Sequence, residues 1–306
     1  MAAVWSVAVF AHNEARGIAS TLRSIIVAAE GAPLNVFVLA NGCHDETAAI
    51  ARECVAVPHQ IHVIEIPLGD KANAWNLYVH TIATTPAVHT AAMHVFVDGD
   101  VQVLPGSLRA LAAAFDQAPT ANAVGGLPNT GRDRAAWCHR MVASGTLAGG
   151  LYALRGDFVG RIRQRGIHIP RGFIGDDWLV SLLAKSDLHP LTMGVANANG
   201  VVFAPGARFS FRSLNPWRPR DYKIYLRRLW RYALRGVQFE MVICWLLHRP
   251  ADALPVDVER LYLLASPPSR LKWFGFTSIL RALAVQKVRN VRAQASRKAR
   301  LPENTK

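Results

Sequence analysis

Asp98 and Asp100 are the pair of side chains in this sequence whose type and spacing best suit metal chemistry. They are separated by Gly99 and follow the largely apolar run 94–97. Carboxylate oxygens are preferred ligands of Mg²⁺ and Mn²⁺, and a metal held there can also bind a phosphate-bearing substrate. An Asp-x-Asp triplet also occurs by chance, and Asp-Gly is a frequent turn dipeptide. The surrounding segments must therefore decide between a metal site and a plain turn.

A second pair of acids, Asp176 and Asp177, precedes Trp178 at the predicted start of a helix. Burial and mutual repulsion can give two adjacent carboxylates different pKa values. Such a carboxylate can act as a general base by accepting the proton of an attacking hydroxyl. Aspartate is also a favourable helix N-cap, so a structural role for the pair stays open.

Short apolar segments alternate with segments of helical periodicity over the first 126 residues. The pattern predicts strands at 4–11, 34–40, 60–67, 92–97 and 121–126, with amphipathic helices between them. Alternating strands and helices of this kind are typical of an α/β fold, in which helices flank a mainly parallel, Rossmann-like sheet.

Polar residues follow each of the first four predicted strands. They are His12, Asn13 and Glu14 after the first strand, Asn41 and Asp45 after the second, Asp70 and Lys71 after the third, and Asp98 and Asp100 after the fourth. Ligands of open α/β sheets bind outside the carboxyl ends of the strands. The four loops therefore predict one binding site at a single edge of the sheet.

The second half of the chain has a less regular pattern. It predicts strands at 149–155 and 195–203, a helix from Asp176, and an Arg-rich helix from about 221 to 247. We therefore divide the chain into a domain of residues 1–236, with halves 1–126 and 127–236, and a helical basic region of residues 237–306.

The 306 residues are 51% hydrophobic, enough for a large core, and carry a formal net charge of +14. The charge is uneven: segment 205–236 holds nine Lys and Arg against one acid, and segment 270–306 holds ten against one.

The four cysteines have no metal-binding or disulfide spacing, which favours a reducing cytosol. The apolar start is predicted to be a strand rather than a signal peptide, and segment 237–247 is too short to span a bilayer.

The ordered motifs resemble the family 2 glycosyltransferases of the GT-A fold over residues 4–240. The resemblance is carried by segments 9–15, 39–47 and 69–77 and by Asp98-Gly99-Asp100. Further along, segment 175–179 is similar to the family's Glu-Asp element, with Asp176 in place of glutamate. Segment 228–232 resembles its Gln-x-x-Arg-Trp element, altered at the first and last positions.

This resemblance implies an inverting enzyme that uses Mg²⁺ or Mn²⁺ to move a sugar from a nucleoside diphosphate sugar, with UDP favoured, to a hydroxyl acceptor. It implies that Asp100 holds the metal, that Asp98 shares it or contacts the ribose, and that Asp177 is the general base, with Asp176 as the alternative. The other residues implied for the nucleotide sugar are Ala11, Asn13, Glu14, Asn41, Asp45, Lys71, Gly99, Arg228 and Arg231. Those implied for the acceptor are Tyr152, Arg155 and Trp178.

Several of these assignments have plain structural alternatives. Lys71 is as readily explained as a solvated lysine, and Arg228 and Arg231 as a basic helix face on a membrane. His12, His44, His94 and His248 lack the paired spacing of a zinc site, which favours structural roles.

The basic tail has Trp273, Phe274 and Phe276 among its cations, together with apolar residues at helical spacing through Leu280, Ala284 and Val288. This composition predicts an interfacial helix on anionic lipid, and hence a peripheral enzyme at the cytoplasmic face of a membrane. The acceptor would then be a lipid, a lipid-linked sugar or a saccharide.

Two other functions remain open. A nucleotidyltransferase of similar fold should begin with a Gly-rich basic loop, and segment 12–17 is not one. A non-catalytic membrane- or RNA-binding module is compatible with the net charge but leaves the acidic loops unexplained. Residues 1–204 have no excess of positive charge, so nucleic acid is not the expected partner, and the sequence predicts no oligomeric state.

Overall fold

The computed structural model describes residues 5–54, 60–191, 200–212, 219–265 and 276–298. Within them, eight strands form one sheet in the order β3-β2-β1-β4-β7-β6-β8-β5. The strands are β1 (Trp5–Ala11), β2 (Leu34–Asn41), β3 (Gln60–Ile66), β4 (Met93–Asp98), β5 (Val101–Val103), β6 (Ala123–Pro128), β7 (Leu151–Arg155) and β8 (Val201–Phe211).

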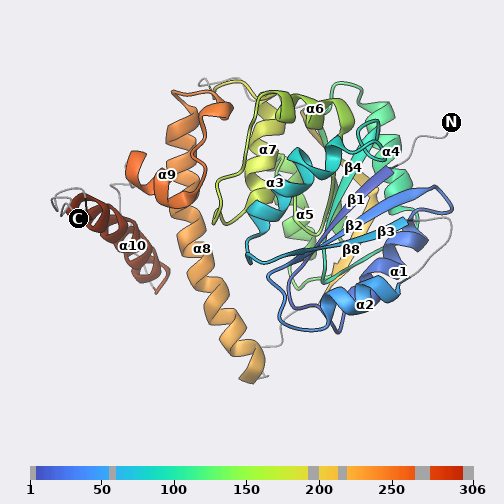
Figure 1. The fold of residues 1–306 in the computed structure, drawn as a ribbon, viewed down its shortest axis with the longest axis horizontal. Helices are drawn as coiled ribbons and strands as arrows, with labels where there is room; N and C mark the ends of the chain where they lie inside the picture. The colour runs from blue at the N-terminus through green and yellow to red at the C-terminus, as the bar shows by residue number, and fades with distance from the viewer. Residues whose placement is uncertain (1–4, 55–59, 192–199, 213–218, 266–275, 299–306) are drawn as a thin grey trace, which may run out of the picture.

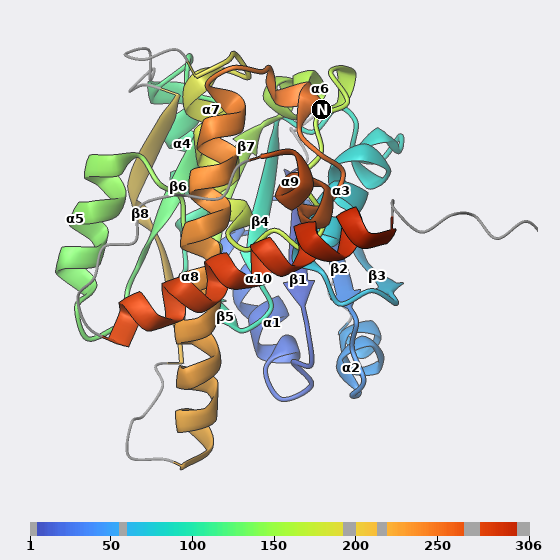
Figure 2. The same ribbon diagram turned by 90° about the vertical axis from the view of Figure 1, so that its left-hand side faces the viewer.

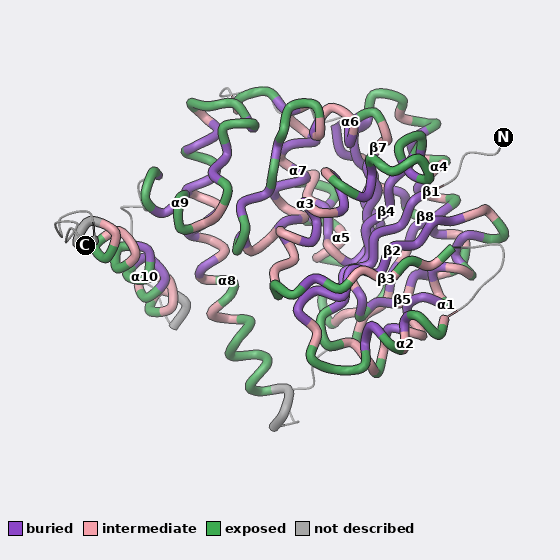
Figure 3. The backbone as a smooth tube through the Cα atoms, in the orientation of Figure 1, coloured by how far each residue is buried: buried purple, intermediate pink, exposed green. Residues whose placement is uncertain are grey.

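Helices cover both faces of this sheet, as Figure 1 shows. Strands β1, β2, β4, β6 and β7 are almost entirely buried, whereas β3 and β8 also have exposed residues (Figure 3). The α-helices are α1 (Ile18–Ala28), α2 (Thr47–Glu53), α3 (Lys71–His80), α4 (Ser107–Gln117), α5 (Arg134–Ser144), α6 (Gly156–Gln164), α7 (Asp176–Ser186), α8 (Pro219–Leu246), α9 (Val258–Leu264) and α10 (Phe276–Lys298). One apolar core lies between the sheet and α3, α6, α7 and α8, and the other between the sheet and α1, α2, α4 and α5. Because side chains alternate along a strand, every strand except the short β5 supplies residues to both cores.

The parallel half of the sheet agrees with the sequence prediction. β2 pairs with β1 and β3, and β1 pairs with β4, all in parallel. The other half is mixed, because β7 runs antiparallel to both β4 and β6, and β5 runs antiparallel to β8. The start of β7 and the end of β8 consequently lie at the same edge as the carboxyl ends of β1 to β4.

The sheet curls so that its two halves approach each other. β4 ends at Asp98 and β5 begins at Val101, yet β5 is four places away from β4 in the sheet order. Four strand spacings in a flat sheet amount to roughly 19 Å, whereas the three chain steps from residue 98 to 101 span at most about 11 Å. The Asp98–Asp100 turn therefore crosses the mouth of a curled sheet.

Gly99 allows this crossing because the chain passes directly over the end of β1. Its backbone N–H donates to the carbonyl of Phe10 at 2.8 Å. A Cβ atom at this position would lie 2.9 Å from both the carbonyl oxygen of Phe10 and Cα of Ala11. Contacts that short exclude any side chain unless the backbone moves.

The strand predicted at 195–203 differs from the structure at its end. β8 continues through Pro205 to Phe211, and residues 195–199 lie outside the described residues. Phe203 pairs with Gly125 and Arg208 with Leu127, so Pro205 lies in a bulge between two paired stretches. Proline is tolerated there because no ladder hydrogen bond is needed from its nitrogen. Strand β5 and helices α5 and α6 were not predicted.

The predicted helical C-terminal region is present as α8, α9 and α10, and α8 passes through the predicted boundary at 236 without a break. Figure 2 shows α10 lying across α8, where Arg281 pairs with Glu240 at 2.7 Å. Ala284 and Val288, predicted to face a membrane, are instead buried in the core shared with α8 and α9. Trp273 and Phe274 lie outside the described residues. Within the described ranges, no helix is long and apolar enough to span a membrane.

Candidate active site

A cleft of about 900 Å³ opens at the edge of the sheet where β1, β2 and β4 end. The sequence-predicted site residues that line it are Ala11, Glu14, Asn41, Lys71, Asp98, Gly99, Asp100, Asp176, Asp177, Arg228 and Arg231. They come from four strand-end loops, from the first turn of α7 and from α8. The structure thus brings together most of the residues predicted for the metal, the nucleotide sugar and the general base.

Lys71 lies at the centre of this cleft and joins its two sides. Its Nζ is 2.7 Å from Oδ1 of Asp98 and 3.2 Å from Oδ2 of Asp176. Burial works against the charged ammonium, but Asp176, Asp98 and Asp177 outweigh it and raise the pKa of Lys71 well above its usual value. Lys71 is therefore a bridging cation rather than a solvated lysine.

Lys71 occupies its position because α3 begins there. The carboxylate of Asp70 caps this helix by accepting from the backbone N–H of Ala72 at 3.0 Å. Its other oxygen accepts from the N–H of Gly172 at 2.7 Å, in the segment that leads to α7. The helix cap thus also holds the segment that carries the second pair of acids.

Asp177 is fixed by two backbone donors at the start of α7. Its Oδ2 accepts from the N–H of Gly149 at 3.0 Å, and its Oδ1 accepts from the N–H of Trp178 at 2.9 Å. Burial and the neighbouring charge of Asp176 raise the pKa of Asp177 to about 6, although Lys71 acts in the opposite direction. A carboxylate with this pKa is largely ionised at neutral pH and is still basic enough to accept a proton.

Asp176 is the more enclosed of the two acids. Its Oδ2 is buried and accepts no hydrogen bond from the residues described, so the ion pair with Lys71 is the contact that compensates for its burial. Its burial and its pairing indicate that Asp176 positions Lys71.

A glycine pair allows β7 to begin directly against the acids. A Cβ atom on Gly149 would lie 2.9 Å from Nζ of Lys71 and 3.0 Å from Oδ2 of Asp98. On Gly150 it would lie 2.3 Å from the ring of Phe209. The sequence predicted a strand here, but only the antiparallel pairing of β7 with β4 brings these glycines to the cleft.

Negative charge accumulates around the Asp98–Asp100 turn. Burial, with repulsion from Asp100, Asp45 and Asp98, raises the pKa of Glu14 to about 7. Burial and the charge of Asp98 also raise the pKa of Asp100. A bound cation would relieve this repulsion, so the donor set fits a hard divalent ion.

The number of protein ligands also bears on the metal. Among the residues that the structure describes, no group of three or more His, Cys, Asp or Glu side chains could hold a metal ion by itself. Asp98 and Asp100 would be two ligands, and Mg²⁺ is commonly held by one or two carboxylates together with substrate phosphates. The site therefore fits a metal that binds together with a diphosphate.

Three residues predicted for the nucleotide shape the loops around the cleft. The amide oxygen of Asn41 accepts from the N–H of Asp70 at 2.9 Å, and that of Asn13 accepts from the N–H of His44 at 2.8 Å. Asp45 accepts from the N–H groups of Ala15 and Thr47, both at 3.1 Å. These bonds tie the loops after β1, β2 and β3 together; Asn41 lines the cleft, whereas Asn13 and Asp45 do not.

The structure does not bring the residues predicted for the acceptor into the cleft. Tyr152 is buried and stacks on Phe96, with 4.9 Å between ring centroids. Arg155 lies at the opposite end of β7 and donates to backbone carbonyls near the end of α4. Trp178 stacks on Phe239 of α8 at 3.8 Å.

The cleft also contains residues that the sequence analysis did not assign to it. They are Phe10, Gly69, Val101, Trp137, Arg140, Ala148, Gly149, Gly150, Ile174, Gly175, Phe209, Phe211, Arg212, Tyr232 and Arg235. Arg235 follows Arg228 and Arg231 at spacings of seven and four, so helical periodicity could have identified it. Arg140 gave no such signal, because α5 was not predicted.

The family model described as glycosyl transferase family 2 matches residues 6–172. No curated protein sequence matches the chain.

Two solved structures superpose on most of the chain. The first is a mannosyltransferase from Pyrobaculum calidifontis in complex with GDP-Man and Mn²⁺, at a TM-score of 0.57 and 20% identity, covering 97% of this chain and 76% of that chain. The second is the glucosyl-3-phosphoglycerate synthase from Mycobacterium tuberculosis in complex with Mn²⁺, UDP-Glc and phosphoglyceric acid, at a TM-score of 0.52 and 17% identity, covering 81% of both chains. These likenesses confirm the predicted GT-A type fold.

Proposed function

The chain belongs to glycosyl transferase family 2, and we propose that it is a metal-dependent, inverting glycosyltransferase. It would move a sugar from a nucleoside diphosphate sugar to a hydroxyl acceptor. The observation that carries the proposal is the placement of Lys71 between Asp98 on one side of the cleft and Asp176 on the other. Lys71 thereby holds the two acids that suit a metal, Asp98 and Asp100, close to the acids that suit a general base. The latter are Asp176 and Asp177.

Asp98 and Asp100 are proposed to hold Mg²⁺ or Mn²⁺. Both superposed structures are complexes with Mn²⁺. When bound, such an ion acts as a Lewis acid that neutralises charge on the leaving diphosphate. Arg228 and Arg231 line the same cleft and can donate two hydrogen bonds each to phosphate oxygens. Glu14 and Asn41, at the strand ends beyond the acids, are proposed to contact the nucleoside.

Asp177 is proposed to be the general base. Its pKa of about 6 leaves it ionised at neutral pH, and it lines the same cleft as Asp98 and Asp100. It would accept the proton of the acceptor hydroxyl as that oxygen attacks the anomeric carbon from the face opposite the diphosphate. A single displacement of this kind inverts the configuration at that carbon.

The acceptor is proposed to enter from an adjoining pocket of about 520 Å³. This pocket shares Lys71, Asp176 and Arg231 with the cleft and extends to Arg171 and Glu259. Its polar lining fits a hydroxyl-bearing group such as a sugar or a lipid-linked sugar. We further propose that the enzyme works at the cytoplasmic face of an anionic membrane.

A panel of UDP- and GDP-sugars, each with Mn²⁺, tests the proposal by thermal stabilisation and nucleotide release. One class of donor should raise the melting temperature and release its nucleoside diphosphate, and EDTA should abolish both effects. Asp100→Ala should lose the stabilisation by metal and donor, while Asp116→Asn, an exposed acid on α4, should retain it. Failure of every donor, or full retention by Asp100→Ala, would overturn the proposed donor site.

A further inference from the structure

The first half of α8 carries an exposed apolar stripe that the catalytic proposal does not use. Tyr222, Tyr225, Leu226 and Tyr232 are 47–57% exposed, and Leu229 between them is partly exposed. Their spacing places all five on one side of the helix. Figures 1 and 2 show this half of α8 projecting below the body of the protein, and Figure 3 shows its surface as exposed.

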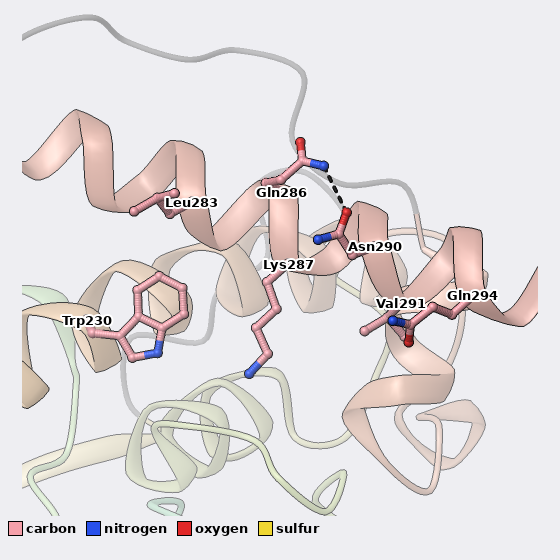
Figure 4. Close-up of a pocket in the computed structure, with 7 residues that line it drawn as sticks. All are labelled: Trp230, Leu283, Gln286, Lys287, Asn290, Val291 and Gln294. Carbon is pink, nitrogen blue, oxygen red and sulfur yellow. Dashed lines mark hydrogen bonds between the residues drawn. The ribbon is translucent and has the colours of Figure 1, made fainter.

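The apolar surface continues toward α10. Trp230 follows Leu226 by four residues and so lies on the same side of α8. It lines a groove of about 430 Å³ between α8 and α10, together with Leu283 and Val291 of α10 (Figure 4). Leu283 is more than half exposed at this groove.

Cations flank the stripe and no acid accompanies it. Residues 222–232 contain Lys223, Arg227, Arg228 and Arg231 but no Asp or Glu. A stripe of tyrosine and leucine beside lysine and arginine fits the boundary between lipid headgroups and acyl chains, where both kinds of group are satisfied. An aqueous polyanion would neutralise the cations but leave the stripe in water.

The same charges disfavour a second copy of this chain as the occupant. A symmetric dimer through this face would bring Lys223 and Arg227 toward an identical pair, whereas Arg228 and Arg231 line the cleft. Anionic headgroups supply the opposite charge at a flat surface, and each nearby Lys or Arg strengthens attachment to them.

We propose that residues 222–232 of α8 lie on an anionic membrane surface and bring the cleft to a lipid-linked acceptor in that membrane. Tyr232 connects the apolar stripe to the cleft, since it is the last residue of the stripe and also lines the cleft. Arg228 and Arg231 extend from the docked helix into the cleft. The membrane contact stands without the proposed function, whereas the statement about the acceptor rests on it.

Flotation with phosphatidylcholine vesicles, with and without phosphatidylglycerol, tests the membrane contact. The wild-type chain should float with the anionic vesicles at low salt and largely dissociate at high salt. The double variant Tyr225→Glu/Leu226→Glu should bind about tenfold more weakly or worse, because it places two acids on the stripe. Val27→Glu, at an equally exposed position on α1, is the matched control and should float like the wild type.

A second variant separates charge from apolar contact. Lys223→Glu/Arg227→Glu keeps the stripe but should lose the preference for phosphatidylglycerol. Equal flotation of the wild type and the Tyr225/Leu226 variant would overturn the proposal. So would failure of the wild type to float, or a dimer in solution that the same variant abolishes.

Donor binding distinguishes this proposal from the proposed function. The Tyr225→Glu/Leu226→Glu variant should show wild-type melting and wild-type stabilisation by nucleotide sugar and Mn²⁺, since neither residue lines the cleft. A wild-type chain that floats but binds no donor would retain the membrane contact and refute the catalytic proposal. A wild-type chain that binds a donor but does not float would refute the membrane contact and leave the catalytic proposal standing.

Discussion

Nζ of Lys71 lies 2.7 Å from Oδ1 of Asp98, which connects the first residue of α3 to the last residue of β4. The same ammonium reaches Asp176 at 3.2 Å. The two sides of the cleft therefore share one cation, and the ionisation of each side depends on it.

Replacing Lys71 by methionine should alter both stability and the pH profile. Asp176 would lose its compensating cation, which should lower the free energy of unfolding by about 1–3 kcal/mol. The pKa of Asp177 should rise above 6, because the charge of Lys71 now lowers it. We expect kcat to fall about a hundredfold and the acid limb of the profile to move to higher pH. Lys71→Arg should restore part of kcat and move the acid limb part of the way back. An unchanged acid limb in Lys71→Met would contradict the bridging role.

The reaction rate of the wild-type enzyme should increase with pH through about 6. A general base works only when deprotonated, and Asp177 loses its proton in that range. Asp177→Asn should remove this limb and lower kcat by about 10²–10⁴-fold. The measurement is kcat against pH with a fixed donor and metal, using Asp116→Asn as the control. If Asp177→Asn kept the acid limb of the wild-type profile, another group would be the general base. Asp176→Asn would then be the next variant to measure.

Glu14→Gln should raise the melting temperature of the metal-free protein at pH 8. The pKa of Glu14 is raised from 4.5 to about 7, so the folded state holds this proton more tightly than the unfolded state does. The resulting stability is present below pH 4.5 and is lost as pH rises through 7. The rise in melting temperature caused by Glu14→Gln should therefore be large at pH 8 and small at pH 5. Glu53→Gln, an exposed acid on α2, should show no such dependence, and equal effects of the two variants would refute the explanation.

Gly99→Ala should destabilise the fold at the metal turn. Its Cβ would meet backbone atoms of Phe10 and Ala11 at 2.9 Å, and overpacking of this kind costs about 1–3 kcal/mol. Urea unfolding measures the loss. Gly160→Ala is the matched control, because a Cβ there meets nothing within 4 Å inside α6 and should stabilise the helix by about 0.5–1 kcal/mol. A Gly99→Ala protein of wild-type stability would disprove the close approach.

The sequence was sufficient for the parallel half of the sheet and for the loops that carry its polar residues. Val7, Val36 and Val95 belong to runs whose local period identifies a strand without reference to the rest of the chain. Residues that directly follow such strands must then lie at one edge, and Glu14, Asn41, Lys71 and Asp98 do lie together there.

Tertiary structure decided which residues meet across the cleft. Sequence periodicity does not specify that β7 runs antiparallel to β4, and this direction brings Gly149 to the acids and carries Arg155 to the far end of the strand. Lys71 and Asp176 are 105 positions apart, and their contact depends on how α7 packs against the curled sheet. The exposed stripe on α8 was likewise invisible in the sequence, because the same spacing of apolar residues is found in helices that are buried.

The sequence alone determined the types of chemical group and their order, since these follow from local patterns. Their distances and partners, and the faces that remain in water, were decided by contacts between distant segments.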